Sequence, residues 1–472
     1  MTRSVSARLL SLAVVCLAGC TALGPTAGDT TPPNVSPAWS AALASQLPAA
    51  DDTVPPLRER ISDPQLATLV TTALAANVDT QIARERIVEA RALAGLDQAE
   101  LRLQLAVDAG ITDQRLSENG VLPAGRIPGF EPNQTLYETG FDASWELDLF
   151  GRRGAVRDRA ALRVALQETE LADTEASLVA EIVRRYVEYN QYAAERALLD
   201  TVVQKQRALF DATVQRRDHG EASDYDVALA KAELAAAQTR VPGVRRAQRI
   251  AHHRLAILTG QAPAALTIEP APPGTAPWSQ AMVIDATPSS ILRRRPDVRV
   301  AEIRYAQSVR DSDLARLDFY PKVTLFAAAG PESTSRGDLT ESASLASAIG
   351  ALFEWAVLDG GRRQATLDAT ESREAQSALA YRRSVLSALE ELENAAVLVT
   401  EAESQYEVQA KLLSTREQLA DAARRRFEGG TVSLLTILES ERDLADARIE
   451  ANRAHTKRHT EVLALEKALG SI

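Results

Sequence analysis

Few residues in this chain have the chemistry or the spacing of a reactive site. The 472-residue sequence holds five histidines and two cysteines. His455 and His459 are four residues apart, the spacing that places two imidazoles on one helix face for zinc. Glutamate does not follow His455 and no third ligand is apparent, so we predict no metal site. We also find no nucleotide-binding glycine loop and no nucleophile elbow, so we expect neither enzymatic activity nor a bound cofactor.

Cys20 is the cysteine with a recognisable chemical context. Two arginines precede an apolar run at 9–17, and the sequence continues into Leu-Ala-Gly-Cys. The run is shorter than the ~20 apolar residues that a spanning helix needs, so we interpret residues 1–19 as a signal peptide. Leu-Ala-Gly-Cys matches the bacterial lipoprotein box, which predicts cleavage before Cys20 and a covalent lipid on it. An ordinary secretory signal that ends near Ala22 is the alternative.

Composition and charge describe a helical, acidic protein. Hydrophobic residues make up 45% of the sequence and aromatic residues only 4%, and Ala, Arg, Leu and Glu dominate, as in long helices. The net charge is -11 and the pI is near 5.2, with no evident basic face. Nucleic acid is therefore not expected as a partner.

A strand that gives way to a very long helix is the main organising feature. Residues 141–149 alternate between apolar and polar types, which predicts a strand with one apolar and one polar face. The alternation stops at Gly151, and about 60 residues of helical composition follow. Trp355 and Gly361 repeat Trp145 and Gly151 at an offset of 210 residues.

A second match keeps the same offset and indicates an internal duplication. Arg-x-x-x-Gly-x-x-Ser occurs at 216–223 and again at 426–433. Two matched sites favour two copies of one unit over three unrelated domains. We expect the following domains: a signal peptide at 1–19, a lipidated tether at 20–61, a first repeat at 62–262, a Pro-rich linker at 263–288 and a second repeat at 289–472.

Periodicity predicts the elements of each copy. The first copy should have a helix at 64–99, strands at 101–109 and 137–149 around a loop at 111–136, and helices at 155–216 and 224–259. The second should have a strand from 321, a loop at 330–343, a strand at 347–358, and helices at 365–427 and 434–469. A coiled-coil seam is expected at Val385, Leu389, Leu392, Ala396 and Val399, and a kink at Pro242.

Four strands in one chain limit what the strands can build. Their lengths suit a tilted strand that crosses a bilayer. Four strands cannot close a useful barrel, and an open edge in lipid leaves backbone groups unpaired at several kcal/mol each. If the strands cross a membrane, several chains must share a barrel, and three chains would supply twelve strands. A soluble periplasmic sheet packed on a core is the alternative.

At this point the sequence resembles one family over almost all of the mature chain. This is the outer-membrane factor family of TolC-like efflux exit ducts, in its OprM/NodT-type lipoprotein branch. The residues that carry the resemblance are Leu17-Ala18-Gly19-Cys20, Asp63-Pro64-x-Leu66, Trp145 to Arg152, Leu292-Arg293-Arg294-Arg295-Pro296-Asp297-Val298-Arg299 and Phe319-Tyr320-Pro321. The run from Leu292 is the most specific of them.

The resemblance implies a mainly α fold with a β-barrel portion. Three chains would form a twelve-stranded transmembrane barrel that continues into a periplasmic coiled-coil tunnel. The implied function is a passive exit duct for drugs or other small molecules in a tripartite efflux or secretion system. Its implied partners are a periplasmic membrane-fusion adaptor, an inner-membrane transporter of the RND type and outer-membrane lipid. Thr21 after the lipidated cysteine favours an outer-membrane location.

The resemblance also implies site residues at the periplasmic tip. Gly220, Ser223, Gly430 and Ser433 would lie where the adaptor docks, although a turn and helix caps need the same residue types. Glu439 and Asp226 would line the aperture, where converging carboxylates repel one another and attract cations. A solvated helix position explains each acid equally simply. The family more often has Asp at the position of Glu439, and some relatives have a second acid where this chain has Thr436.

Two other classes of protein compete with the duct. A periplasmic coiled-coil adaptor or structural lipoprotein would keep its strands out of lipid, and an enzyme would need a polar cluster that the sequence lacks. The four membrane-length strands, with Trp145 and Trp355 expected on the outside, favour the duct over both.

Overall fold

The structure, a computed structural model, describes residues 55–117, 131–272, 277–279 and 288–472. In chain order its elements are α3 (Leu57–Arg60), α4 (Pro64–Ala76), α5 (Val78–Ala99), β1 (Gln104–Arg115), β2 (Asn133–Leu147), α6 (Arg152–Asp218), α7 (Asp224–Leu258), α8 (Pro288–Arg294), α9 (Pro296–Leu317), β3 (Lys322–Ser333), β4 (Leu345–Glu354), α10 (Arg362–Glu428) and α11 (Leu434–Ala468). Two short 3-10 helices, Asp338–Thr340 and Ser342–Ser344, separate β3 from β4.

The chain divides into two compact units, and each takes residues from both predicted repeats. Among the described residues the first, here called the sheet unit, comprises Ile87–Leu166 and Glu302–Ala380. The second, here called the hairpin unit, comprises the described residues up to Arg86, with Gln167–Ala301 and Tyr381–Ile472.

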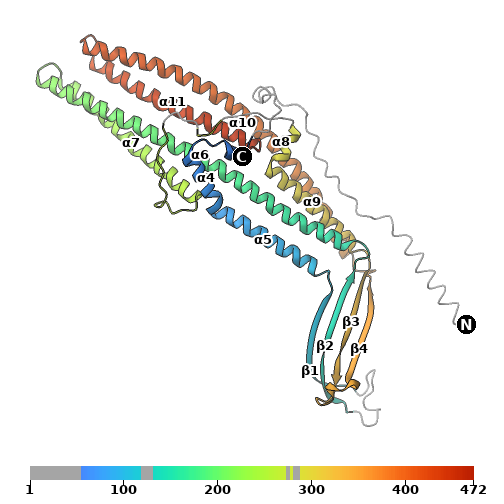
Figure 1. Cartoon of the computed structure of the whole chain (residues 1–472). Helices are drawn as coiled ribbons and strands as arrows, with labels where there is room; N and C mark the ends of the chain where they lie inside the picture. The colour runs from blue at the N-terminus through green and yellow to red at the C-terminus, as the bar shows by residue number, and fades with distance from the viewer. Residues whose placement is uncertain (1–54, 118–130, 273–276, 280–287) are drawn as a thin grey trace. The chain divides into compact units, whose positions relative to one another are not determined.

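Four antiparallel strands form a single sheet in the order β1-β2-β3-β4 (Figure 1). Leu105 pairs with Ala143, Trp145 with Leu325, and Val323 with Phe353. Paired residues share a face of the sheet, and successive residues alternate between faces. All odd-numbered strand residues therefore lie on one face of this sheet and all even-numbered residues on the other.

The four predicted strands exist, but their boundaries were wrong. β1 starts at Gln104 and continues to Arg115, and β2 starts at Asn133 and ends at Leu147. Beyond Ile111 the extra residues pair as a mostly polar ladder, for example Asp113 with Thr135. Alternation of apolar with polar residues could not reveal this part of the hairpin, because polar residues dominate both faces there.

The second hairpin extends into its predicted loop for a different reason. β3 continues through Gly330 and Pro331 to Ser333, where a loop was expected. A Cβ atom at Gly330 would lie 2.0 Å from the carbonyl oxygen of Thr139, so only glycine lets β2 and β3 approach this closely. β4 ends at Glu354, which leaves Trp355 just outside the strand.

The change from strand to long helix has the same construction in both copies. Gly151 and Gly361 adopt positive φ angles of 83° and 87°, which glycine accepts without strain. Asp148 then accepts a hydrogen bond of 3.1 Å from the backbone N–H of Arg153, and Asp359 accepts one of 3.1 Å from Arg363. An acid thus satisfies a free N–H at the start of α6 and of α10.

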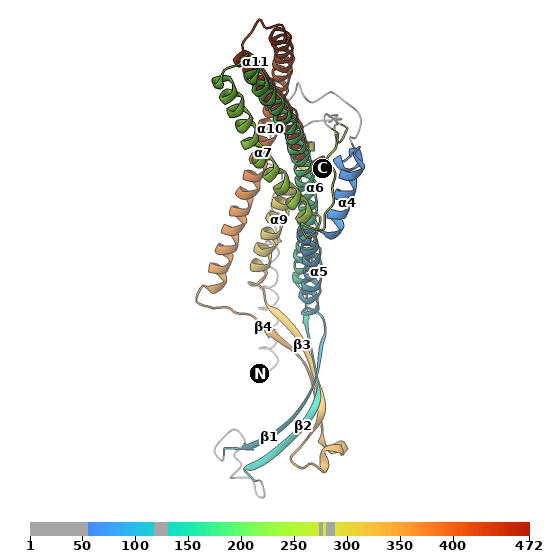
Figure 2. The same cartoon turned by 90° about the vertical axis from the view of Figure 1, so that its left-hand side faces the viewer.

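Two helical hairpins, α6–α7 and α10–α11, dominate the hairpin unit (Figure 2). Each long helix ends in a Schellman turn at a glycine of positive φ, Gly220 or Gly430. Ser223 and Ser433 are the N-caps of the returning helices, as predicted, and their hydroxyls accept from the backbone N–H groups of Asp226 and Thr436. α7 runs through Pro242 as one continuous helix.

The single helix predicted at 64–99 is two helices that break at Asn77. Asn77 has an extended backbone (φ −64°, ψ 132°). Its side-chain amide donates to the carbonyl of Leu258 at 3.0 Å, and its side-chain oxygen accepts from the N–H of Thr80 at 3.2 Å. Apolar residues keep their helical spacing across the break, so the sequence pattern does not show it.

The hydrophobic core of the hairpin unit lies where the shorter helices meet the long ones. Its largest fully buried side chains include Leu66, Ile182, Tyr186, Leu255 and Trp278. The predicted seam on α10 is confirmed, because Val385, Leu392, Ala396 and Val399 are buried and Leu389 is half-buried. Among the residues that the structure describes, no helix has the length and apolarity to cross a membrane.

A buried ion pair attaches α3 to the end of α11. The guanidinium of Arg60 donates to both carboxylate oxygens of Glu466, at 3.1 and 2.8 Å. The two side chains are only 5% and 2% exposed. Burial raises the pKa of Glu466, and the hydrogen bonds from Arg60 act in the opposite direction. Removal of one partner would leave the other as an uncompensated buried charge.

We predict that Arg60→Met destabilises the hairpin unit by about 3 kcal/mol, within the range for a broken buried pair. The double variant Arg60→Met/Glu466→Leu should recover most of that loss, because no charge then remains buried. Guanidinium unfolding of the purified protein, followed by circular dichroism, measures both. Equal stability of the single variant and the unmodified protein would contradict the prediction.

Candidate functional site

One face of the sheet is apolar and uncovered in the single chain. Its odd-numbered residues include Leu105, Val107 and Ile111 of β1, Tyr137, Phe141 and Trp145 of β2, Val323 and Leu325 of β3, and Leu345, Ile349 and Phe353 of β4. Ile349 is 89% exposed and Val107 is 70% exposed. An apolar surface of this extent marks contact with lipid or with another protein.

The opposite face of the sheet is polar and acidic. Its even-numbered residues include the carboxylates Asp108, Glu138, Asp142, Glu146, Glu332 and Glu354, with Lys322 as its basic residue. Phe326 is the large aromatic side chain on this face. A Cβ atom at Gly350 would lie 2.6 Å from its ring, so the ring occupies the space that a side chain at this position of β4 would need. The sheet can therefore separate an apolar medium from water.

Aromatic and arginine side chains gather at the helical end of the sheet. The guanidinium of Arg153 lies over the ring of Trp145, 5.2 Å from its centroid, and that of Arg363 lies 5.3 Å from the centroid of Phe319. Trp355, 51% exposed, donates its indole N–H to the carbonyl of Phe319 at 3.1 Å. Trp145 lies on the apolar face as predicted, and Trp355 lies beyond the end of β4.

The residues expected to dock a partner lie at the two hairpin turns. Gly220 and Gly430 are exposed, as are Ser223 and Ser433. Their backbone conformations and caps account for all four residue types in the absence of any partner. The glycines leave open space around both turns, because a Cβ atom at either position would meet nothing within 4 Å.

The two hairpins pack against each other near these turns. Leu434, Ile437 and Leu438 of α11 form a buried cluster with Leu209, Leu229 and Phe427. Glu441 of α11, 13% exposed at its side chain, pairs with Arg424 of α10 and with Lys205 of α6 at 3.4 Å. The tip of the hairpin unit is thus one packed structure in each chain.

The two acids expected at an aperture have different surroundings. Asp226 accepts from the backbone N–H of Ser223 at 2.9 Å and from its hydroxyl at 2.7 Å, which completes a capping box. These hydrogen bonds, first the one from the backbone, lower the pKa of Asp226. Glu439 is exposed on the second turn of α11. In this chain the two carboxylates share no hydrogen bond or ion pair, and the helix cap alone explains Asp226.

His455 and His459 belong to the packing of α11. Their Nε2 atoms lie 3.3 Å apart, and His459 meets the edge of Trp278 with ring centroids 5.7 Å apart. Burial lowers the pKa of His459 to about 4, so this imidazole is neutral at physiological pH. Within the described ranges no three His, Cys, Asp or Glu side chains gather as a metal site. Cys20 lies outside the described residues.

Sequence reasoning flagged the run from Leu292 to Arg299 but missed the role of Arg295. This guanidinium, 7% exposed, donates to the carbonyl of Ala468 at 2.8 Å, to Asp297 at 2.8 Å and to Glu391. Burial acts to raise the pKa of Asp297, but the hydrogen bond and the positive charge of Arg295, together with backbone hydrogen bonds, lower that pKa overall. Arg295 thus links α9, α10 and α11. The sequence feature that could have pointed to Arg295 is its position directly before Pro296, the residue at which α9 begins.

Comparison with known proteins gives consistent matches over most of the chain. The family described as outer membrane efflux protein matches residues 69–261 and 287–471. The chain is 28% identical to Outer membrane protein OprJ of Pseudomonas aeruginosa, over 99% of this chain and 95% of that protein. It is 26% identical to Nodulation protein T of Rhizobium leguminosarum bv. trifolii, over 87% of this chain and 86% of that protein.

Solved channel structures have the same fold. The outer-membrane channel OprN superposes with a TM-score of 0.83 at 27% identity, covering 94% of this chain and 99% of that one. The CmeC outer membrane channel of Campylobacter jejuni gives a TM-score of 0.83 at 18% identity, covering 93% of each chain, and is a likeness of fold alone. The expected fold class, mainly helical with a β-barrel portion, is confirmed.

The family match covers well over half of the sequence, and the sheet has the two-faced character that a membrane channel needs. This uncovered apolar face also decides against a periplasmic adaptor or structural lipoprotein. The chain belongs to the outer membrane efflux protein family, and it is an efflux channel of the bacterial outer membrane.

Proposed function

We propose that three copies of this chain pool their hairpins into one twelve-stranded barrel in the outer membrane. The observation that carries the proposal is the four-stranded sheet with an exposed apolar face and two outer strands, β1 and β4, that have no further partner among the described residues. Unpaired backbone groups in lipid cost several kcal/mol each, so the edges must pair. β4 of one chain and β1 of the next supply the missing ladders, and twelve strands fall within the range of known barrels.

The height of the apolar face supports a membrane location for this barrel. Ten residue steps separate Tyr137 from Leu147 on β2, and both lie on the apolar face. These steps span about 33 Å along the strand, or about 25 Å at a tilt of about 40°, which is the height of the apolar band of outer-membrane barrels.

The helices supply a second argument for assembly. On α10 five of the six exposed large apolar residues of the hairpin unit are separated by steps of 11, 11, 4 and 7 residues, which places them on one face of the helix. They are Leu386, Val397, Val408, Leu412 and Leu419, and the sixth is Leu398 beside Val397. Burial of this stripe between neighbouring chains would extend the barrel into a helical tunnel, the periplasmic part of the homotrimer.

The assembled channel acts as a passive exit duct. We propose that it conducts drugs or other small molecules delivered by a periplasmic membrane-fusion adaptor and an inner-membrane transporter of the RND type. One relative is named Toluene efflux pump outer membrane protein TtgF, which associates this kind of channel with a pump. Among the described residues no three His, Cys, Asp or Glu side chains gather as a metal site. In this proposal the partner transporter supplies the energy, and the chain acts without a cofactor and not as an enzyme.

The tip of the hairpin unit is the proposed contact with the adaptor. Gly220, Ser223, Gly430 and Ser433 form two exposed turns with open space around the glycines. A helical hairpin from the adaptor can approach such turns closely because no side chain stands in the way. Glu439 and Asp226 are the proposed aperture acids. Glu439 has the stronger case, because its carboxylate is exposed while that of Asp226 caps its own helix.

The N-terminal part of the chain is the proposed anchor. Residues 1–19 are removed as a signal peptide, Cys20 carries a covalent lipid in the outer membrane, and 20–61 forms the tether. The last part of this tether, α3, is held against the end of α11 by the Arg60–Glu466 pair. A relative named Probable outer membrane lipoprotein SilC supports the lipid. The repeats at 62–262 and 289–472, with a linker at 263–288, remain the proposed domain boundaries.

A charge on the apolar face tests the barrel. We predict that Val107→Lys destabilises membrane assembly by about 2–4 kcal/mol, as a lysine near the bilayer centre does in outer-membrane barrels. Its matched control is the adjacent Asp108→Lys, which places the same charge on the polar face. Native mass spectrometry in mild detergent should find trimers for the unmodified protein and for Asp108→Lys, with fewer for Val107→Lys. Monomers alone in the unmodified protein would refute the shared barrel.

The aperture role is tested by conductance. We predict that Glu439→Ala raises single-channel conductance in planar bilayers, because three converging carboxylates are removed from the narrowest part of the duct. Glu428→Ala, an exposed acid on the same hairpin, is the matched control and should leave conductance unchanged. Identical conductance in all three proteins would remove Glu439 from the aperture.

The lipid anchor is tested by mass. Cys20→Ser should leave the exported protein without acyl chains, because the cysteine thiol is their point of attachment. Intact mass spectrometry of the mature protein should show a lipidated N-terminus at residue 20 only in the unmodified chain. An unlipidated N-terminus near residue 22 in both proteins would favour an ordinary secretory signal.

A further inference from the structure

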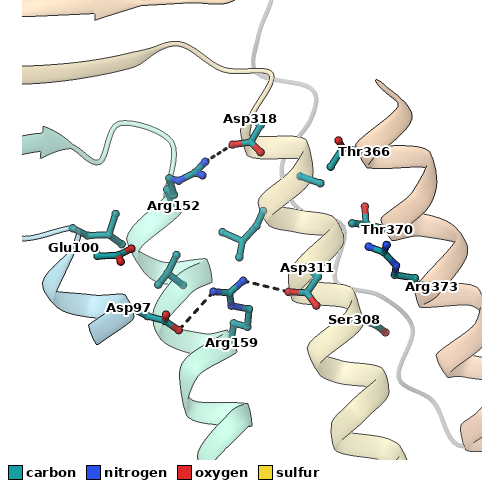
Figure 3. A pocket seen from close by; sticks show the side chains of 14 residues that line it. Asp97, Glu100, Arg152, Arg159, Ser308, Asp311, Asp318, Thr366, Thr370 and Arg373 are labelled. Atoms are coloured by element: carbon teal, nitrogen blue, oxygen red, sulfur yellow. Dashed lines mark hydrogen bonds and ion pairs between the residues drawn. The ribbon is translucent and has the colours of Figure 1, made fainter. Parts of the chain in front are cut away.

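A hollow of about 470 Å³ lies in the helical part of the sheet unit (Figure 3). Side chains from α5, α6, α9 and α10 line it, all within residues of the sheet unit. Its volume is in the range of small-molecule sites in proteins. The outer membrane efflux function does not by itself require such a hollow.

Charged pairs and an apolar floor shape the hollow. Arg152 pairs with Asp318 at 2.7 Å, and Arg159 lies 3.6 Å from Asp97 and 3.5 Å from Asp311 (Figure 3). Between the charged pairs the lining is apolar, from Leu101, Val156, Leu314 and Ala315. An apolar floor with a few fixed polar groups is typical of sites that bind small organic molecules.

Two charged side chains on this lining are not engaged. Glu100 follows α5, and Arg373 lies on α10, so they come from the first and the last of the four lining elements. Both side chains are exposed, and neither has a hydrogen bond or ion pair with another residue that the structure describes. The hollow therefore offers one free anion and one free cation on different walls.

The hollow continues onto the polar face of the sheet. A neighbouring hollow of about 370 Å³ shares Arg152, Asp318 and Thr366 with it and is also lined by Lys322 and Glu354. Lys322 and Glu354 are register partners on the even-numbered, polar face. If that face lines the duct, as proposed above, the hollow opens into the duct interior.

We propose that this hollow is a binding site for small amphiphilic zwitterions, in which an apolar spacer separates an amino group from a carboxylate. The carboxylate pairs with Arg373, which can donate two hydrogen bonds to it, and the amino group pairs with Glu100. The spacer covers the apolar floor. Binding at this site is weak, because a duct must release what it binds. The location inside the duct rests on the proposed function, whereas the site itself rests on the sheet unit of one chain.

The test uses 8-aminooctanoate, octanoate and octylamine as probes at neutral pH. Ligand-detected NMR titration measures their binding to the full-length protein in lipid nanodiscs, with empty nanodiscs subtracted. 8-Aminooctanoate should bind more tightly than either singly charged probe. Arg373→Ala should weaken 8-aminooctanoate and octanoate about tenfold, the usual effect of a lost charge-assisted hydrogen bond, and leave octylamine unchanged. Glu100→Gln should weaken 8-aminooctanoate and octylamine and leave octanoate unchanged.

Matched controls separate the site from general charge effects. Arg157→Ala and Asp158→Asn alter an exposed acid and base on α6 that do not line the hollow, and they should leave all three affinities unchanged. Arg373→Lys keeps the charge and should restore octanoate binding to within about threefold, which excludes misfolding as the cause. Equal effects of the control variants, or equal binding of the three probes, would overturn the site.

Trimer mass and conductance of the same preparation keep the two proposals apart. A conducting trimer that does not discriminate the probes refutes the zwitterion site and leaves the duct intact. A protein that binds the probes as described but forms no trimer refutes the shared barrel and leaves the hollow as a site of the single chain. Retained discrimination in both Arg373→Ala and Glu100→Gln would also refute the assigned residues.

Discussion

The pairing of backbone hydrogen bonds at the sheet edges is the constraint on which the rest of this structure depends. One chain contributes four strands, and the outer edges of β1 and β4 carry unpaired groups that lipid cannot satisfy. The apolar face adds a second demand, because side chains such as Ile349 and Val107 are uncovered in the monomer. A closed barrel of several chains answers both demands at once, since closure removes the edges and turns the apolar face to lipid.

The connection from strand to helix joins a part of the chain that suits lipid to a part that suits water. In the barrel each backbone group needs a neighbouring strand, whereas in a helix it needs only its own chain. Gly151 and Gly361 make the turn, and Asp148 and Asp359 cap the helices that follow. Asp359 lies 211 residues after Asp148, one more than the repeat offset of 210, yet both acids cap the helix that follows them. The two strand-to-helix connections therefore share this capping more closely than they share sequence.

Sequence reasoning found what periodicity can show. Alternation revealed all four strands, and the absence of Pro and Gly revealed both long helices. It missed the ends of the first hairpin, where polar residues such as Asp113 and Thr135 pair without an apolar face. It also missed the break at Asn77, because that residue is held by Leu258, a contact 181 residues away. Distant contacts of this kind do not appear in a local pattern.

For the candidate site, too, the sequence predicted the features that depend on local residues and missed those that depend on distant contacts. Turn chemistry predicted Ser223, Ser433 and the glycines of both tips, because caps and positive φ angles depend on local sequence. The hydrogen-bond partners of Asp226 and Arg295 could not be chosen from the sequence alone, because several residues were possible partners for each. Asp226 caps its own helix, and Arg295 joins three helices through Ala468, Asp297 and Glu391.

The placement of charge follows from the work of a passive channel. Strong, buried pairs such as Arg60–Glu466 lie in the helix packing, where they fix the position of α3 against α11. The polar face of the sheet instead carries acids in contact with water, and Glu100 and Arg373 remain unengaged beside their hollow. Solvated charges interact weakly with a passing molecule because water screens them. A wall of this kind can guide cargo without retaining it, whereas a wall of desolvated pairs would hold its cargo or exclude it.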